Sequence, residues 1–292
     1  MRAVWSYWSV PYRARRGFSW TAERTHALSW VLSVELARPY FDSIALHTDD
    51  EGARFLVDRL GLCFDSVCLS LNQLRHEDPD WWMMGKLQTY AEQTEPFVHI
   101  DSDVYLFKPL PRRLTSAPVL AQNPEQVGPG CFWYGVESCE IALRTRGDGF
   151  IPPEWTWYRT FVPHQRAACC GILGGNNVAF LRDYAQSVLR ILKSPGNRHA
   201  FDHDPLKRDY NPFFEQYLLA AFAAHRGIPV AYLFESFDDG IRSAAAQGFT
   251  HLMAEAKRDA RTAARIEQRV ARDYPEAFRR CLRMLPPARV CA

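Results

Sequence analysis

The first hundred residues alternate short apolar runs with segments of helical periodicity, and this alternation limits the folds open to the chain. Strand-like runs lie at 3–8, 43–48, 64–69 and 96–107. Between them, apolar residues recur at helical spacing, most clearly in 20–37. A β-α-β-α-β-α-β order is typical of a mostly parallel sheet with helices on both faces. We therefore predict an α/β fold, with ligands bound beyond the carboxyl ends of the strands.

The rest of the chain extends this pattern less regularly. Residues 108–168 are rich in Pro, Gly and aromatic residues without a clean period, so we expect irregular strands and loops that could form the wall of an acceptor site. A strand runs into a helix over 171–181, and a late strand covers 228–234. With 292 residues, we expect one catalytic domain over 1–251 and a helical segment, 252–292, packed on it.

Composition excludes several classes of protein. A net charge of +2 is too balanced for nucleic acid to be the main partner. The 8 cysteines include no C-x-x-C pair, which argues against a zinc site. The N-terminus lacks the pattern of a signal peptide, and no window has the ~20 apolar residues of a membrane span. A reduced, cytoplasmic protein is the expectation.

The C-terminal segment is basic. Lys and Arg number nine against five acids between Glu255 and Arg283. A solvated helix face is the preferred interpretation. Peripheral contact with the anionic inner face of a membrane is the lesser one.

The strand at 96–107 carries two aspartates, Asp101 and Asp103, separated by one serine. Residues two apart on a strand point to the same face, so the carboxylates would meet at the strand end. Two such charges repel unless a cation neutralises them, and divalent metals prefer oxygen ligands. The spacing alone is more typical of an Asx-rich turn, so other residues must support a metal site.

Further residues suit a diphosphate site around this pair. Lys86 lies in the helix that precedes the aspartates, and Asn176 and Asn177 follow a Gly-Gly pair that would let backbone approach a ligand. Far downstream, His251 and Lys257 lie six residues apart. An imidazole could complete a metal shell, and an ammonium could neutralise a phosphate.

Five segments of the chain match the pattern of a known family, in the same order. They are Phe64 to Val67, Lys86-Leu87, Gly174 to Val178, Glu215-Gln216, and the pair His251 and Lys257. The chain therefore resembles the retaining glycosyltransferases of family 8, the glycogenin and bacterial lipopolysaccharide galactosyltransferase group, which have a GT-A fold. The similarity covers about residues 1–257.

The chain departs from the family pattern at several points. Ala254 stands where the family's H-x-x-G-x-x-K motif has Gly, and Asp259 stands where Pro-Trp is frequent. Glu215 replaces an Asp, and residues 108–168 match no part of the family pattern.

The resemblance implies a nucleotide-sugar donor, with a UDP-sugar expected, held through Mn²⁺ (or Mg²⁺) by Asp101, Asp103 and His251. Lys257 and Lys86 would neutralise the diphosphate as the glycosyl bond breaks. A metal and a lysine suit this step because negative charge develops on the leaving group.

The resemblance also assigns contacts along the donor. Ser6, Tyr7 and the Thr48-Asp49 strand end would meet base and ribose. Glu215 or Gln216 would lie near the anomeric carbon, with Glu215 either a nucleophile or a positioning group. Asn176 and Asn177 would complete the site, although Asn177 could either touch the acceptor or cap the turn that follows it.

Two alternatives remain open from the sequence. A nucleotidyltransferase on a similar sheet would need a Gly-rich triphosphate loop, which Ser6 to Pro11 lacks, although the basic segment Arg13 to Gly17 keeps that option. A non-catalytic binder of sugar nucleotides or of a membrane surface is the other. The acceptor stays open among a glycan, a lipid-linked sugar, a peptide and a small molecule.

Overall fold

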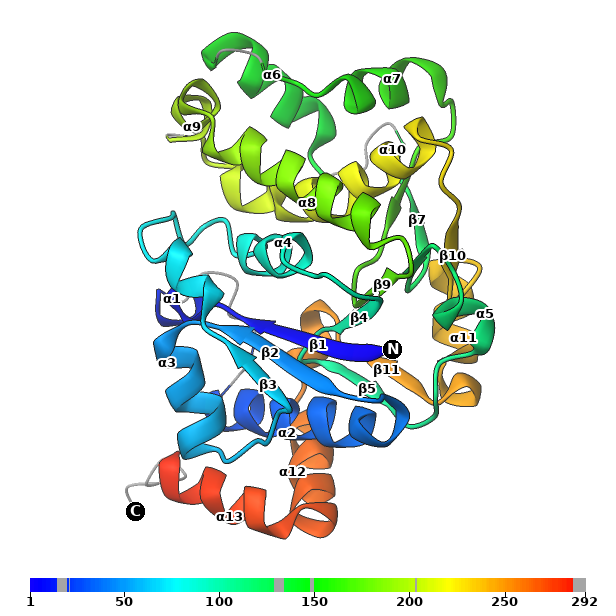
Figure 1. The fold of residues 1–292 in the computed structure, drawn as a ribbon. Coiled ribbons are helices and arrows are strands. Elements are labelled where there is room, and N and C mark those ends of the chain that lie inside the picture. The colour runs from blue at the N-terminus through cyan, green and yellow to red at the C-terminus, as the bar shows by residue number, and fades with distance from the viewer. Residues whose placement is uncertain (15–19, 21, 129–133, 148–149, 203, 286–292) are drawn as a thin grey trace.

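A computed structural model describes residues 1–14, 20, 22–128, 134–147, 150–202 and 204–285 of the chain. It is an α/β protein in which a seven-stranded sheet lies between helical layers (Figure 1). The predicted fold class, a mostly parallel sheet flanked by helices with a helical C-terminus, is confirmed. Most of the basic segment Arg13 to Gly17 lies outside the described residues.

The central sheet has the strand order β10-β6-β9-β4-β1-β2-β3. Its strands are β1 (Arg2–Tyr7), β2 (Ile44–Thr48), β3 (Ser66–Cys68), β4 (Phe97–Ile100), β6 (Val119–Ala121), β9 (Ile172–Gly175) and β10 (Val230–Tyr232). Neighbours pair in parallel except β9, which runs antiparallel to both β4 and β6. The carboxyl ends of β1 and β4 therefore lie at one edge of the sheet, where ligands of such folds bind.

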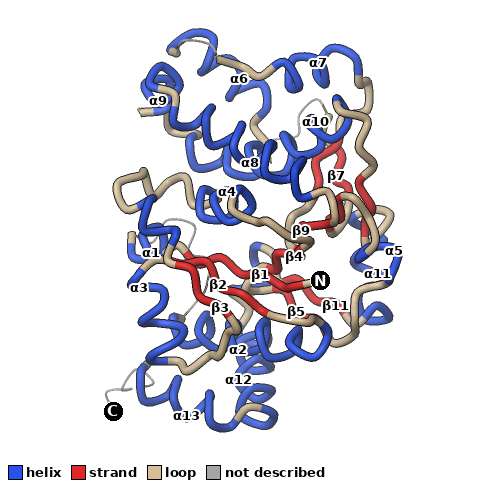
Figure 2. The backbone as a smooth tube through the Cα atoms, viewed as in Figure 1, coloured by secondary structure: helices blue, strands red, loops and turns tan. Residues whose placement is uncertain are grey.

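Two small antiparallel pairs extend the sheet region. They are β5 (Val104–Leu106) with β11 (Phe249–His251), and β7 (Pro124–Gln126) with β8 (Arg166–Ala168). Because β5 follows β4 almost directly, β11 is held beside the carboxyl end of β4 (Figure 2).

Helices cover both faces of the sheet (Figure 1). Those in the first half are α1 (Ser9–Arg13), α2 (Glu23–Ala37), η1 (Arg38–Tyr40), α3 (Asp50–Ala53), η2 (Arg54–Arg59), η3 (Ser70–Leu74), α4 (Met84–Ala91), α5 (Arg112–Thr115) and α6 (Val136–Arg146). Those in the second half are α7 (Pro153–Phe161), α8 (Val178–Lys193), α9 (Pro195–Phe201), η4 (Lys207–Tyr210), η5 (Phe213–Tyr217), α10 (Leu218–His225), α11 (Phe237–Gln247), η6 (Ala254–Lys257), α12 (Ala260–Asp273) and α13 (Pro275–Met284). One apolar core lies under α4 and α8, and a second lies under α2 and α12.

Residues 108–168 are more regular than we expected. They contain β6 of the central sheet, the β7–β8 pair and the helices α6 and α7. In α7, Trp155 and Tyr158 are buried, which gives this helix one apolar face. The expectation of irregular structure throughout was wrong because these elements are short and their apolar faces carry few residues.

The C-terminal helices pack on the outer side of α2 (Figure 1). Ile266 and Val270 of α12 and Cys281 of α13 are buried there. Arginines such as Arg265 and Arg279 are exposed, as predicted for a solvated basic face. Among the described helices, none combines the length and apolar character needed to cross a bilayer.

The Gly-Gly pair of β9 serves the sheet rather than a ligand. A Cβ on Gly174 would lie 1.9 Å from the carbonyl oxygen of Phe97, and one on Gly175 would lie 2.2 Å from that of Pro118. Glycine therefore lets β9 fit between β4 and β6.

We expect Gly174→Ala to lower the free energy of unfolding by about 3 kcal/mol, since backbone atoms of a central strand must move. Gly128→Ala is the matched control, because a Cβ there meets no atom within 4 Å. Urea denaturation followed by circular dichroism measures both. Equal stability of the two variants would contradict this role for Gly174.

Candidate functional site

A cleft of about 1180 Å³ opens beyond the carboxyl ends of β1 and β4. Most of the predicted site residues line it, namely Ser6, Tyr7, Lys86, Asp101, Asp103, Glu215, Gln216, His251 and Lys257. They come from segments spread over the whole described chain, so the fold gathers them from a distance.

The two aspartates lie in the turn between β4 and β5, and this turn brings their carboxylates together. The strand ends at Ile100, and the amide of Val104 donates to the carbonyl oxygen of Asp101 at 3.0 Å. The prediction that they lie on one strand face was therefore wrong, although the expected convergence occurs. His251, at the end of β11, joins them because it pairs with Val104. The ligand atoms of Asp101, Asp103 and His251 all lie within 4.8 Å of one another.

The imidazole of His251 is oriented for metal binding. Its Nδ1 lies 2.7 Å from Oε1 of buried Gln122, an acceptor, so Nδ1 carries the proton and Nε2 is free to act as a ligand. Nε2 faces Asp103 at 3.6 Å. A Cβ on Gly171 would lie 2.3 Å from Oε1 of Gln122 and 2.6 Å from Nδ1 of His251, so only glycine fits beside this contact. Burial lowers the pKa of His251 to about 4, which keeps the ring neutral.

Lys257 is the counter-charge of Asp103. Its ammonium forms an ion pair with the Asp103 carboxylate and lies 5.9 Å from the ring centre of Trp20. Burial alone would raise the pKa of Asp103, but Lys257 and His251 outweigh it and hold that pKa below its ordinary value. Asp103 is therefore ionised and able to bind a cation.

Lys86 bridges two buried acids. Its Nζ lies 2.9 Å from the Asp101 carboxylate and 2.7 Å from Oε1 of Glu215, a side chain with no exposed surface. Burial, with the carboxylates of Asp103 and Glu215, raises the pKa of Asp101 to about 7 although Lys86 opposes the rise. Lys86 is thus occupied within the site, which leaves the direct diphosphate contact predicted for it without support.

Glu215 and Gln216 lie on η5, a π-helical turn, a structure frequent at functional sites. Oε1 of Glu215 accepts from the hydroxyl of Tyr90 at 3.2 Å, and Oε2 is buried without a hydrogen-bond partner in the part of the chain that the structure describes. Oε1 of Gln216 lies 3.0 Å from the hydroxyl of Tyr134, and this hydroxyl donates its proton to Glu125.

The side of the cleft next to β1 is aromatic. Tyr7 and Trp30 pack edge to face at 5.5 Å, and Tyr12 stacks on His26 at 4.8 Å. All four line the cleft. The Ser6 hydroxyl lies 2.9 Å from Nε2 of His99. Planar apolar surfaces of this kind suit a nucleobase.

Thr48 and Asp49 do not line the cleft, which corrects the prediction that they contact base or ribose. The Thr48 hydroxyl donates to the carbonyl oxygen of Tyr7 at 2.6 Å. The Asp49 carboxylate caps α3 through the amide of Gly52 and accepts two hydrogen bonds from Ser9. Both side chains are buried in structural roles.

Asn176 and Asn177 follow the end of β9 that lies away from the aspartates, so their predicted place in the site was wrong. Because β9 is antiparallel to β4, its start at Ile172 pairs with Ile100, and its end pairs with the start of β4. Asn177 instead caps α8 through the amide of Phe180, and Asn176 donates to the carbonyl oxygen of Thr115.

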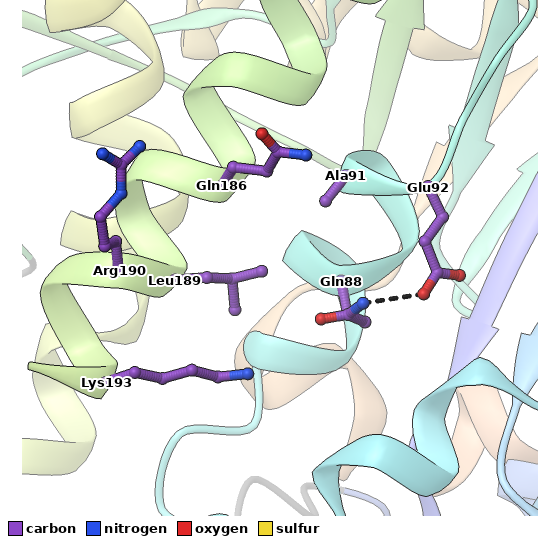
Figure 3. A pocket seen from close by; sticks show the side chains of 7 residues that line it. All are labelled: Gln88, Ala91, Glu92, Gln186, Leu189, Arg190 and Lys193. Atoms are coloured by element: carbon purple, nitrogen blue, oxygen red, sulfur yellow. Dashed lines mark hydrogen bonds between the residues drawn. The ribbon is translucent and has the colours of Figure 1, made fainter.

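A second hollow, of about 410 Å³, lies between α4 and α8 (Figure 3). Gln88 donates to Glu92 across its edge at 2.7 Å, and Lys193 reaches toward it from α8. None of the predicted site residues lines it.

His47, Cys68 and Glu92 form another group with ligand atoms close enough for a metal. However, the amide of Gln93 faces Nε2 of His47 at 3.2 Å, and Arg2 fixes that amide by donating to its oxygen. Nε2 is then an acceptor, and Nδ1–H donates to Glu92 at 3.2 Å. With its proton on Nδ1, the ring offers no ligand on the side of Glu92, so the aspartate centre is the better metal site.

The loop between His251 and Lys257 contains a strained residue. Ala254 has φ +43°, and among the described residues it is the non-glycine residue with positive φ. An alanine in this region costs about 1 kcal/mol relative to glycine.

Three further residues of the site were not predicted from the sequence: Gln122, which contacts His251, and Glu125 and Tyr134, which line the cleft. They lie within 108–168, where neither periodicity nor a motif marks them. Their contacts with His251 and Gln216 join positions 82 to 129 residues apart, which local patterns do not encode.

We expect Lys86→Met to lower the free energy of unfolding by about 3 kcal/mol, because Asp101 and Glu215 lose their shared cation. Glu215→Gln in the same background should restore at least about 1 kcal/mol. Lys193→Met, at a more exposed ion pair with Glu77, serves as control and should cost less than about 1 kcal/mol. Urea denaturation measures these free energies of unfolding. Equal stability of Lys86→Met and the control would contradict the bridging role of Lys86.

Comparison with known proteins gives one family. The model of a family described as "Family of unknown function (DUF6734)" matches residues 1–284. No curated protein matches the chain. The match spans nearly the whole sequence, and the chain therefore belongs to this family of unknown function.

Proposed function

We propose that the protein is a metal-dependent glycosyltransferase that takes a sugar from a nucleotide-sugar donor, with a UDP-sugar expected. The observation that carries the proposal is the convergence of Asp101, Asp103 and His251 within 4.8 Å at the carboxyl end of a sheet strand. Two carboxylates and a neutral imidazole suit Mn²⁺ or Mg²⁺. Their convergence also favours a working site over the non-catalytic alternative.

The strained loop supports the resemblance on which the donor class rests. The family pattern has Gly between the His and the Lys, and this chain has Ala254 there. Its backbone nevertheless takes the left-handed conformation, at φ +43°, that glycine adopts most readily. The loop geometry that a glycine would supply is therefore kept although the residue has changed.

The cleft offers distinct surfaces to the parts of such a donor. The base would stack on the aromatic side formed by Tyr7, Tyr12 and Trp30, with Ser6 at the strand end. The diphosphate would lie beside Asp101, Asp103 and His251. When bound, the metal would supply a Lewis acid that stabilises charge on the leaving diphosphate.

The protein side chains divide the remaining work. Lys257 is within reach of the same charge and would stabilise the diphosphate as the bond breaks. Lys86 holds Asp101 and Glu215 in place. Glu215 and Gln216 would position the sugar hydroxyls, and retention at the anomeric carbon is carried over from the family 8 resemblance.

We also propose a class of acceptor and a cellular location. The acceptor would be a glycan, a lipid-linked sugar, a peptide or a small molecule, and nucleic acid is not expected. The described cysteines are free thiols, which fits a cytoplasmic enzyme. The exposed arginines of α12 and α13 would permit peripheral contact with an anionic membrane face.

Calorimetric titration of UDP with and without Mn²⁺ tests the function. We expect UDP to bind at least about tenfold more tightly with Mn²⁺ than with EDTA, a difference of about 1.4 kcal/mol. Asp103→Asn should abolish the effect of Mn²⁺ because it removes a charged ligand. A screen of nucleotide sugars for release of the nucleoside diphosphate would then identify the donor.

Asp58→Asn is the control, since Asp58 is an exposed aspartate outside the cleft. It should bind UDP as the unaltered protein does. Metal-independent binding, or an Asp103→Asn variant that keeps the Mn²⁺ effect, would refute the proposed site. Binding of nucleoside triphosphates in preference to UDP would favour a nucleotidyltransferase.

A further inference from the structure

We propose that Glu125 is the base that accepts the proton of the incoming hydroxyl group at the acceptor side of the cleft. This inference rests on the proposed glycosyl transfer and goes beyond it, because nothing in the sequence or in the family resemblance selects Glu125.

The position of Glu125 supports this role. It lies on β7, lines the cleft and is half-buried. The hydroxyl of Tyr134 contacts both Glu125 and Oε1 of Gln216. Gln216 is the neighbour of Glu215, which contacts Lys86 and through it Asp101. Glu125 is thus connected to the metal ligands through side chains that line the same cleft.

Glu125 differs from the other carboxylates of the cleft. These carboxylates are Asp101, Asp103, Glu125, Glu215, Asp238 and Glu255. Lys86 neutralises Asp101 and Glu215, and Lys257 neutralises Asp103. Glu255 is exposed and pairs with Arg258, and Asp238 is exposed in the first turn of α11. Within the described part of the chain, Glu125 is the half-buried carboxylate of the cleft without a cationic partner.

The partner of Glu125 leaves its charge in place. The hydroxyl of Tyr134 donates to Oε2, and among the described residues no hydrogen bond or ion pair reaches Oε1. Burial and the Glu125 carboxylate raise the pKa of Tyr134 far above its ordinary value, so this hydroxyl stays a donor. A neutral donor orients the carboxylate without cancelling its charge. A carboxylate held this way can bind a hydroxyl group and take its proton.

The acceptor O–H bond breaks and its proton goes to Glu125. The acceptor oxygen forms a bond to the anomeric carbon on the face from which the diphosphate leaves, so that the configuration at this carbon is retained. The bond from that carbon to the diphosphate breaks, and its electron pair leaves on the diphosphate. Water is the smallest acceptor, so hydrolysis of the donor reports the same step.

Glu125→Gln tests the role, because the amide oxygen can still accept from Tyr134 while the base is lost. We expect the kcat of Mn²⁺-dependent UDP-sugar hydrolysis to fall by about 100-fold. The donor KM, the Kd for UDP with Mn²⁺ and the melting temperature should stay within about twofold and a few degrees of the unaltered protein. Glu276→Gln, the same change at an exposed glutamate of α13 outside the cleft, should leave kcat unchanged.

The outcomes separate this inference from the proposed function. Unchanged hydrolysis in Glu125→Gln, an equal loss in Glu276→Gln, or a loss of UDP binding parallel to the loss of kcat would overturn the role of Glu125. An unaltered protein that binds UDP with Mn²⁺ but hydrolyses no UDP-sugar would also overturn it. Failure of UDP to bind at all would instead refute the proposed function.

Discussion

The burial of like charges at one point is the constraint on which the site depends. Asp101, Asp103 and Glu215 are brought into one cleft, where their mutual repulsion must be balanced. Lys86 balances Asp101 and Glu215, and Lys257 balances Asp103. Lysine side chains of the protein itself therefore neutralise the carboxylates of the site.

The two lysines differ in how the fold holds them. Lys86 lies on α4 and contacts two buried acids. If it moved away, both carboxylates would remain buried without a cation. Lys257 lies at the end of η6, after the strained Ala254, and contacts one acid. This contrast explains why we assign Lys86 to holding the site and Lys257 to the diphosphate.

The sequence predicted the parts of the site that local patterns encode. The β-α alternation gave the mostly parallel sheet, and the spacing of the aspartates with His251 and Lys257 selected residues that do meet. The prediction was wrong where the direction of a strand, or a contact between residues far apart in the sequence, determines the site. Nothing near Asn176 reveals that β9 runs antiparallel, and this reversal removes Asn176 and Asn177 from the site. Likewise, the contact of Gln122 with His251 spans 129 residues.

We infer that a divalent metal binds Asp101, Asp103 and His251 and carries a nucleoside diphosphate. Anomalous diffraction from crystals soaked with MnCl₂ and UDP would locate both. We expect a manganese peak bounded by these three side chains, with the diphosphate bound to it. A crystal that takes up manganese only at the group of His47, Cys68 and Glu92, or that holds UDP with no metal beside it, would refute the proposed site.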